Sequence, residues 1–375
     1  MSKPFPPLLS LVPYPFLPAV NGGHLGIAEM HRHLALYCED HVAGTVGNAP
    51  TIPEPFALHK IFGQTTSRYL PFRYQQALVR LGESTQVGAV FCEHPYMAIS
   101  ARAVAKALGV PWFLRSHNIE SERFRQMGKL WWPVLARYER WAMQHSTGTF
   151  FVTAEDARWA QQHWAIPERT CHVAPYGTPL IHTPVPRPEA RQRLAQTLGI
   201  RTEVSWLYFL GALDYRPNAE AVEYLITEIA PRLAASGNAV EILLAGKGLA
   251  PELAARLSGT GITYTGFLPS LDDFLSACDV MLNPVLTGGG IKTKAVEALA
   301  WGKRVVSCSS GAAGLDRAVC GEALYVSKDG NWERFVAHIL QATQTDAIVP
   351  EAFYRFYHWG EVAHGVLQTI FPEAR

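Results

Sequence analysis

Short runs of apolar residues alternate with longer segments of helical periodicity along most of the chain. In the first half, the runs "VGAVFC" (87–92), "PWFLRS" (111–116) and "GTFFVT" (148–153) are each followed by a stretch of helical character. Continuous apolar runs of this length are typical of parallel strands that are buried on both faces by helices. The pattern therefore predicts an α/β fold, with an earlier strand at Leu8 to Val12.

A proline-rich segment, "APYGTPLIHTPVPRP" (174–188), separates this pattern from a second copy of it. Proline interrupts both helices and central strands, so we place a domain boundary here. Beyond it, strands are predicted at "SWLYFLG", "AVEILLAGKG", "ITYTGF", "DVMLNPV" and "KRVVSCS", with helices between them. The chain is thus expected to form two doubly wound domains, residues 1–180 and 190–350, with ligands bound beyond the carboxyl ends of the strands.

Length, charge and cysteine content narrow the function classes. A chain of 375 residues with 48% hydrophobic residues is too long for one ordinary core and agrees with two domains. The formal net charge of +1 argues against a general nucleic-acid-binding protein. The six cysteines are scattered without a CxxC pair, which favours reduced thiols in a cytoplasmic protein. No stretch approaches the roughly 20 apolar residues that span a bilayer.

The stretch "TGGGIKTKAVEAL" (287–299) follows one predicted strand and opens a predicted helix with three consecutive glycines: Gly288, Gly289 and Gly290. Glycines let the backbone approach a phosphate closely, and N–H groups at a helix start point at it. Lys292 and Lys294 add positive charge at the positive end of the helix dipole, which is unfavourable unless an anion is present. The motif predicts an anion-binding loop. The alternative is a flexible loop with solvated lysines, in which Lys294 pairs with Glu297.

Together with "FLGALDYRPNAEAVEYL" and "LLAGKG", this stretch resembles the retaining nucleotide-sugar glycosyltransferases of family four, in the branch with a triple-glycine loop found in bacterial polysaccharide assembly. The resemblance is strong over about 205–315 and moderate at 11–24 and 111–124. It implies the GT-B fold, in which two Rossmann-like domains face a central cleft and the last helix, about 351–375, packs back on the first domain. It also implies transfer of a sugar from a nucleotide-diphosphate donor to an acceptor hydroxyl, without a metal or another cofactor.

Residue by residue, Glu297 matches the family's second glutamate, which holds the nucleotide ribose. The first glutamate, which contacts the donor sugar, falls at Gly289, and the arginine and lysine that neutralise the diphosphate fall at Ala212 and Asn218. We hypothesise that the positive charge has moved to the glycine loop, with Arg216 as a reserve. The remaining donor-binding residues expected from these motifs are Lys247, Phe267, Leu268 and Ile291.

In the first domain, the stretch "YPFLPAVNGGHLGIAEMHRHLAL" places Gly22 and Gly23 between a strand and a helix, and resembles the family's N-terminal glycine loop. His117 in "RSHNIESERF" matches the family histidine near the reacting sugar and is the expected catalytic residue. A satisfied polar residue at a strand end is the alternative. His94 in "FCEHPY" has a similar position with weaker support.

Two other functions stay open, a non-catalytic nucleotide-sugar-binding protein and a nucleotide-sugar epimerase. An epimerase needs acid and base carboxylates, which Glu297 alone does not supply. The expected partners are a nucleotide sugar and a glycan or lipid-linked acceptor, with no nucleic acid. The stretch "KLWWPVLARYERWAM" (129–143) fits a peripheral contact with the inner face of a membrane, but a buried amphipathic helix is the favoured interpretation.

Overall fold

The computed structural model describes residues 3–70, 72–268 and 270–374. The chain divides into two compact units. One runs to Pro179 and resumes at Trp359, and the other is Leu180–His358. The division lies inside the proline-rich segment. Helix α15 (Glu351–Tyr357) belongs to the second unit, so the segment that returns to the first unit begins at Trp359 and not at about 351 as expected from the resemblance. The reason is that the hydroxyl group of Tyr354 donates to the carbonyl of Ala300, 3.0 Å away, and so fixes α15 to the second unit.

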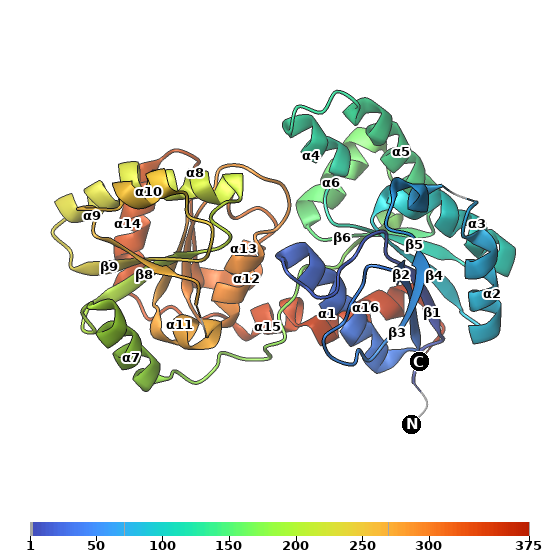
Figure 1. The fold of residues 1–375 in the computed structure, drawn as a ribbon, viewed down its shortest axis with the longest axis horizontal. Coiled ribbons are helices and arrows are strands. Elements are labelled where there is room, and N and C mark those ends of the chain that lie inside the picture. Colours follow the sequence, from blue (N-terminus) through green and yellow to red (C-terminus); the bar gives the residue numbers. More distant parts are fainter. Residues whose placement is uncertain (1–2, 71, 269, 375) are drawn as a thin grey trace. The chain divides into compact units, whose positions relative to one another are not determined.

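The first unit is a seven-stranded parallel sheet in the order β3-β2-β1-β4-β5-β6-β7 (Figure 1). Its strands are β1 (Leu8–Leu11), β2 (Asp40–Thr45), β3 (Ala57–Phe62), β4 (Ala89–Glu93), β5 (Trp112–Ser116), β6 (Gly148–Phe151) and β7 (Cys171–Val173). Its helices are α1 (Gly22–Tyr37), α2 (Gln75–Thr85), α3 (Ala98–Leu108), α4 (Glu120–Gln126), α5 (Trp132–His145), α6 (Ala154–Trp164) and α16 (Trp359–Ile370). Alternate residues of the central strands enter two separate cores, one against α3, α5 and α6 and the other against α1 and α16.

The second unit is a six-stranded parallel sheet in the order β10-β9-β8-β11-β12-β13 (Figure 1). Its strands are β8 (Ser205–Leu210), β9 (Val240–Ala245), β10 (Ile262–Gly266), β11 (Val280–Asn283), β12 (Arg304–Cys308) and β13 (Leu324–Ser327). Its helices are α7 (Pro188–Leu198), α8 (Arg216–Tyr224), α9 (Ala230–Ala235), α10 (Pro251–Arg256), α11 (Leu271–Ala277), α12 (Thr293–Ala300), α13 (Arg317–Cys320), α14 (Trp332–Thr343) and α15. A π-helical turn, Leu225–Ile229, joins α8 to α9.

Both sheets reverse their strand order at one point, between β1 and β4 in the first unit and between β8 and β11 in the second. All ladders are parallel, so the carboxyl ends of the strands share one edge of each sheet. Ligands of doubly wound sheets bind at this edge, beside the reversal point. Within the described residues, no helix combines the length and apolarity that crossing a bilayer requires.

Candidate functional site

The carboxyl edge of the second sheet is built from glycine turns. Gly211 follows β8, Gly246 follows β9 and Gly266 ends β10, and all three have positive φ angles, of 156°, 131° and 70°. A Cβ atom on Gly246 would lie 1.8 Å from the carbonyl oxygen of Gly211, so two backbones are in direct contact there. Only glycine permits this approach, which leaves a surface of backbone groups at the edge.

The glycine loop between β11 and α12 completes this edge. Gly288 and Gly290 have φ angles of 88° and 68°, a region that favours glycine. A Cβ atom on Gly288 would come within 3.3 Å of Pro217 in α8. The loop is also held by Thr287, whose hydroxyl group donates to the Glu220 carboxylate of α8 over 2.7 Å. The loop is therefore anchored at its first residue rather than free.

Lys292 is the residue before α12, and its side chain folds back over the loop. Its Nζ donates to the carbonyl oxygens of Gly288 and Gly290, at 2.7 and 3.0 Å, and reaches that of Gly289 at 3.3 Å. Burial lowers the pKa of Lys292 to about 8. The ammonium group thus gathers the three glycine carbonyls on one side of the loop, a role that its sequence position did not indicate.

Lys294 lies at the second position of α12 and points toward the end of β8. Its Nζ donates to Oδ1 of Asn218 over 2.8 Å and lies 3.8 Å from the centre of the Phe209 ring. Burial, and after it the charge of Lys292, lower its pKa well below the usual value, and no carboxylate counters this effect in the described part of the chain. Lys294 therefore does not pair with Glu297, and the alternative of solvated lysines is wrong.

Glu297 lies one turn into α12, in the same helix as Lys294 and five residues after Lys292. Burial raises its pKa to about 7, and the negative charge of Asp272 adds to the effect. A carboxyl group with this pKa can both accept and donate hydrogen bonds near neutral pH. Glu297 is thus a partly buried group suited to hydroxyl ligands rather than a solvated carboxylate.

The other predicted donor residues lie at the same edge with fewer contacts. The side chain of Phe267 is 75% exposed, and Leu268 packs against the core. Lys247 is exposed and accepts the Leu213 N–H with its carbonyl oxygen, at 2.8 Å. Arg216 is 88% exposed and binds Glu220 over 2.8 Å, so its charge already has a partner. Ile291 is partly buried against the core beside the loop.

In the first unit, His117 follows β5 and meets a buried glutamate from the end of β4. Its Nε2 lies 2.5 Å from Oε2 of Glu93, and the other carboxylate oxygen of Glu93 accepts from Arg115 over 3.1 Å. Burial alone would raise the pKa of Glu93, but Arg115 and His117 hold it well below its usual range. Burial lowers the pKa of His117. Glu93 therefore stays ionised and fixes the orientation of the His117 ring.

His94 stacks on His117, with ring centres 3.9 Å apart and planes 8° from parallel. Its φ of 66° is unusual for a residue other than glycine, and such strain tends to occur at functional sites. Its Nε2 is bonded to the Tyr14 hydroxyl group, and its buried Nδ1 has no hydrogen-bond partner among the described residues. Burial and the neighbouring His117 lower the pKa of His94 well below its usual value. The two rings are therefore stacked at the carboxyl ends of β4 and β5.

Gly22 and Gly23 form the first turn of α1, where Asn21 caps the helix by accepting the His24 N–H over 3.0 Å. This helix start and Tyr14 both follow β1, the strand at the reversal point of the first sheet. Sequence reasoning missed Tyr14, Glu93 and Arg115. The sequence offered one signal for Glu93: its carboxylate in "FCEH" directly follows an apolar run. A buried charge there would be unfavourable without a partner, which indicates that one exists.

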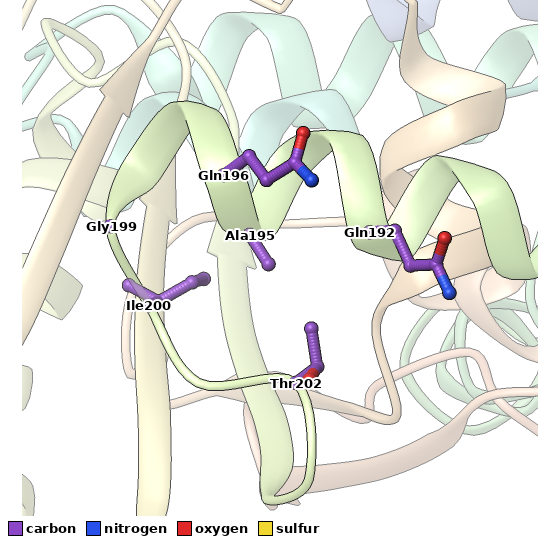
Figure 2. A pocket seen from close by; sticks show the side chains of 6 residues that line it. All are labelled: Gln192, Ala195, Gln196, Gly199, Ile200 and Thr202. Carbon is purple, nitrogen blue, oxygen red and sulfur yellow. The ribbon is translucent and has the colours of Figure 1, made fainter.

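A hollow elsewhere in the second unit is lined by α7 and the segment that follows it (Figure 2). Gln192, Ala195 and Gln196 contribute from the helix, and Ile200 and Thr202 from the segment. This segment leads into the first residue of β8, so the hollow lies toward the amino end of the strand, away from the glycine turns. It holds no titratable side chain and offers no chemistry.

Two family descriptions match the chain: residues 21–180 match glycosyltransferase family 4, and residues 205–345 match glycosyl transferases group 1. A solved glycosyltransferase from Rickettsia africae is 12% identical with a TM-score of 0.69, over 99% of this chain and 94% of that one. HepE from Anabaena, in complex with UDP and glucose, is 16% identical with a TM-score of 0.69, over 98% and 100%. The lipopolysaccharide outer core galactosyltransferase WaaB is 12% identical with a TM-score of 0.68, over 98% and 99%. No curated protein sequence matches the chain. These likenesses confirm the predicted pair of doubly wound sheets.

Proposed function

Because the chain belongs to the GT-B glycosyltransferases, we propose that it moves a sugar from a nucleotide-diphosphate donor to an acceptor hydroxyl, with retention at the anomeric carbon, in polysaccharide assembly. The observation that carries the donor assignment is Lys294, a partly buried lysine whose Nζ donates to Asn218 and has no carboxylate partner among the described residues, beside a glycine-lined sheet edge. A partly buried amine without a counterion gains most from the binding of an anion. The nucleotide diphosphate is the anion that this edge of a doubly wound sheet suits.

The proposed chemistry is electrostatic stabilisation of the leaving diphosphate. As the bond between sugar and phosphate breaks, negative charge grows on the phosphate oxygens, and cations fixed in advance around them lower the barrier. Lys294 supplies one such charge from the start of α12, and the N–H groups of the loop add partial charge. Lys292 supplies a second when its ammonium group exchanges a glycine carbonyl for a phosphate oxygen. No step in this account uses a metal ion.

Glu297 is proposed to bind the ribose hydroxyls. It lies one turn beyond the helix start, and its raised pKa lets it exchange hydrogen bonds with both hydroxyls of a ribose. Phe267 and Leu268 are proposed to meet the base with backbone groups. Solved HepE structures carry UDP and UDP-glucose, so uridine nucleotides are the first donors to test.

The first unit is proposed to bind the acceptor, a glycan or lipid-linked glycan, beside His117. With Glu93 holding Nε2, the other ring nitrogen of His117 is left to contact the reacting sugar. The stacked His94 ring prevents His117 from turning away. Gly22 and Gly23 are proposed to let the backbone approach the donor phosphate.

A non-catalytic nucleotide-sugar-binding protein is the second candidate, and Gly289 favours it. The position at which relatives carry a sugar-reading glutamate has no side chain here, and its carbonyl oxygen faces Lys292. Such a protein would bind donors without turnover.

Turnover distinguishes the two candidates. We expect release of nucleoside diphosphate from at least one sugar donor in a panel, with EDTA present and with acceptor glycans added or omitted. Tight binding of a nucleotide sugar without release under any of these conditions would refute the transferase and support the binding protein. Release that stops on adding EDTA would refute the metal-free mechanism alone.

A further inference from the structure

The turn between α4 and α5 exposes several large apolar side chains. The exposed fractions are 55% for Met127, 93% for Leu130, 49% for Trp131 and 68% for Val134. Single exposed apolar residues are ordinary on soluble proteins. Four within the segment 127–134, which we name the hairpin tip, form a local patch of the kind that marks an interaction surface.

Basic residues surround the hairpin tip. Lys129 lies in the tip, and Arg137 and Arg140 are exposed on α5. No aspartate or glutamate occurs between residues 123 and 138. Arg125 on α4 is paired with Glu122 over 2.7 Å, which leaves the other three without a carboxylate partner in the described part of the chain. Exposed apolar groups among unpaired cations match the surface of a membrane that contains anionic lipid.

The structure shows α5 as an amphipathic helix, as the favoured sequence interpretation expects, and it identifies the face that stays exposed. One face of α5 is buried through Leu135, Glu139, Ala142 and Met143. Val134, Arg137 and Arg140 nevertheless face solvent. The helix therefore packs on the first unit along one face and presents the opposite face and its first turn to the outside.

The hairpin is held firmly at its base, and α4 and α5 lie side by side (Figure 1). The buried Glu139 carboxylate of α5 accepts the N–H groups of Glu120 and Ser121, at 2.9 and 2.7 Å, where α4 begins. Nearer the tip, the rings of Phe124 and Trp131 contact each other at 4.5 Å. The tip is thus presented in a fixed conformation, which reduces the entropy lost when it binds.

We propose that the hairpin tip docks on an anionic lipid bilayer. A second copy of the chain is a poorer occupant, because a twofold contact would place the same cations against each other. A bilayer satisfies both features at once, since the apolar side chains enter the interface and the cations remain at the headgroups.

Docking has a consequence for the acceptor, which rests on the proposed function. Helix α4 begins three residues after His117 and has seven residues, which corresponds to a length of about 10 Å. With the hairpin tip on the membrane, His117 would be separated from the bilayer surface by about the length of α4. This favours a lipid-linked acceptor over a free glycan.

The test measures cosedimentation with vesicles of phosphatidylcholine alone and of phosphatidylcholine with phosphatidylglycerol, without any sugar donor. We expect binding to the anionic vesicles that weakens as salt rises from 50 to 500 mM, and little binding to the neutral ones. Replacing Leu130 and Val134 together by Ser should lower the partition coefficient at least tenfold. K129Q with R137Q should lower it on anionic vesicles only.

The matched control replaces Val185 and Ile348 by Ser, since these side chains are 80% and 81% exposed in the second unit. Absence of wild-type binding, or an equal loss in this control, would overturn the proposal. The proposal would also be overturned if the wild type associates with itself but does not bind vesicles, and the Leu130 and Val134 variant abolishes this self-association. Because no donor is present, the result is independent of turnover, and donor turnover without vesicle binding would refute docking alone.

Discussion

Replacing Lys294 by Met tests the assignment of the diphosphate site most directly. Met keeps an unbranched side chain over the Phe209 ring but removes the charge and the hydrogen bond to Asn218. If Lys294 serves to bind an anion, the variant should lose affinity for a nucleoside diphosphate and keep its affinity for the matching nucleoside. The stability of the folded protein without ligand should change little, because the loss of the hydrogen bond to Asn218 is offset by removal of a partly buried amine without a carboxylate partner.

The magnitude follows from the kind of contact that is lost. A hydrogen bond to a charged group contributes about 1.5–3 kcal/mol, and about 1.4 kcal/mol corresponds to a factor of ten in affinity. The dissociation constant for the diphosphate should therefore rise by about 10-fold to 150-fold. Lys292→Met should have a smaller effect on affinity and should lower stability, because three glycine carbonyl oxygens lose their shared donor.

Calorimetric titration with the nucleoside diphosphate chosen by the donor panel, and with its nucleoside, measures both affinities, and thermal unfolding measures stability. Lys303→Met is the matched control. This lysine is also partly buried in the second unit but stands before β12, at the amino edge of the sheet, and donates to the carbonyl of Ser276 at 3.3 Å. Equal losses for diphosphate and nucleoside, or an equal loss in the control, would refute the assignment.

Three further predictions follow from single contacts. Gly246→Ala should lower the free energy of unfolding by at least about 1–3 kcal/mol, because the added Cβ atom would lie 1.8 Å from the Gly211 carbonyl oxygen. The control is Gly237→Ala, where φ is 70° and no atom lies within 4 Å of the added Cβ, so that only the backbone cost remains. Thermal unfolding measures both variants. Glu93→Gln should lower kcat about 10-fold to 100-fold, because His117 would lose the partner that orients it. In a His117→Ala background the same substitution should cause no further loss of kcat. Additive losses in this double-mutant cycle would instead show that Glu93 is merely structural. The pKa of Glu297 is about 7, so the folded state keeps a proton that the unfolded state releases near pH 4.3. The contribution of this group to stability should therefore fall as pH rises from about 4.3 to 7. Chemical denaturation across that range should show this slope in the free energy of unfolding, and Glu297→Gln should remove it.

Much of this fold follows from elementary patterns, and the exceptions have physical causes. Strands β4, β5, β8 and β11 were predictable because central parallel strands are buried on both faces and therefore read as apolar runs. Strand β3 was not, because an edge strand needs no such run, and "ALHKIF" is exposed or partly buried at all but its last residue. The π-helical turn after α8 was equally hidden, since "LITEI" continues the helical spacing of its neighbours.

In the candidate site too, contacts within one loop were predictable from the sequence, whereas contacts between distant segments were not. Glycines and lysines within one loop predict an anion site because the dipole rule acts over a single helical turn. The pairing of Glu93 with His117 joins the ends of two strands, 24 positions apart in the chain, and no local rule specifies it.

The contact between Lys294 and Asn218 links these two kinds of information. From the sequence, Asn218 was a position at which a family lysine is missing, and Lys294 was one of two lysines in a loop predicted to bind an anion. The structure brings the two side chains within 2.8 Å. A cation supplied from α12 therefore reaches the place at which one from α8 would have stood. This geometry supports the hypothesis of relocated charge, because the charge has changed its helix while staying at the same end of β8. The missing glutamate at Gly289 has no such substitute in the contacts of the loop, where Lys292 engages only backbone carbonyls. The proposed site is therefore better equipped to hold a diphosphate than to select the sugar attached to it.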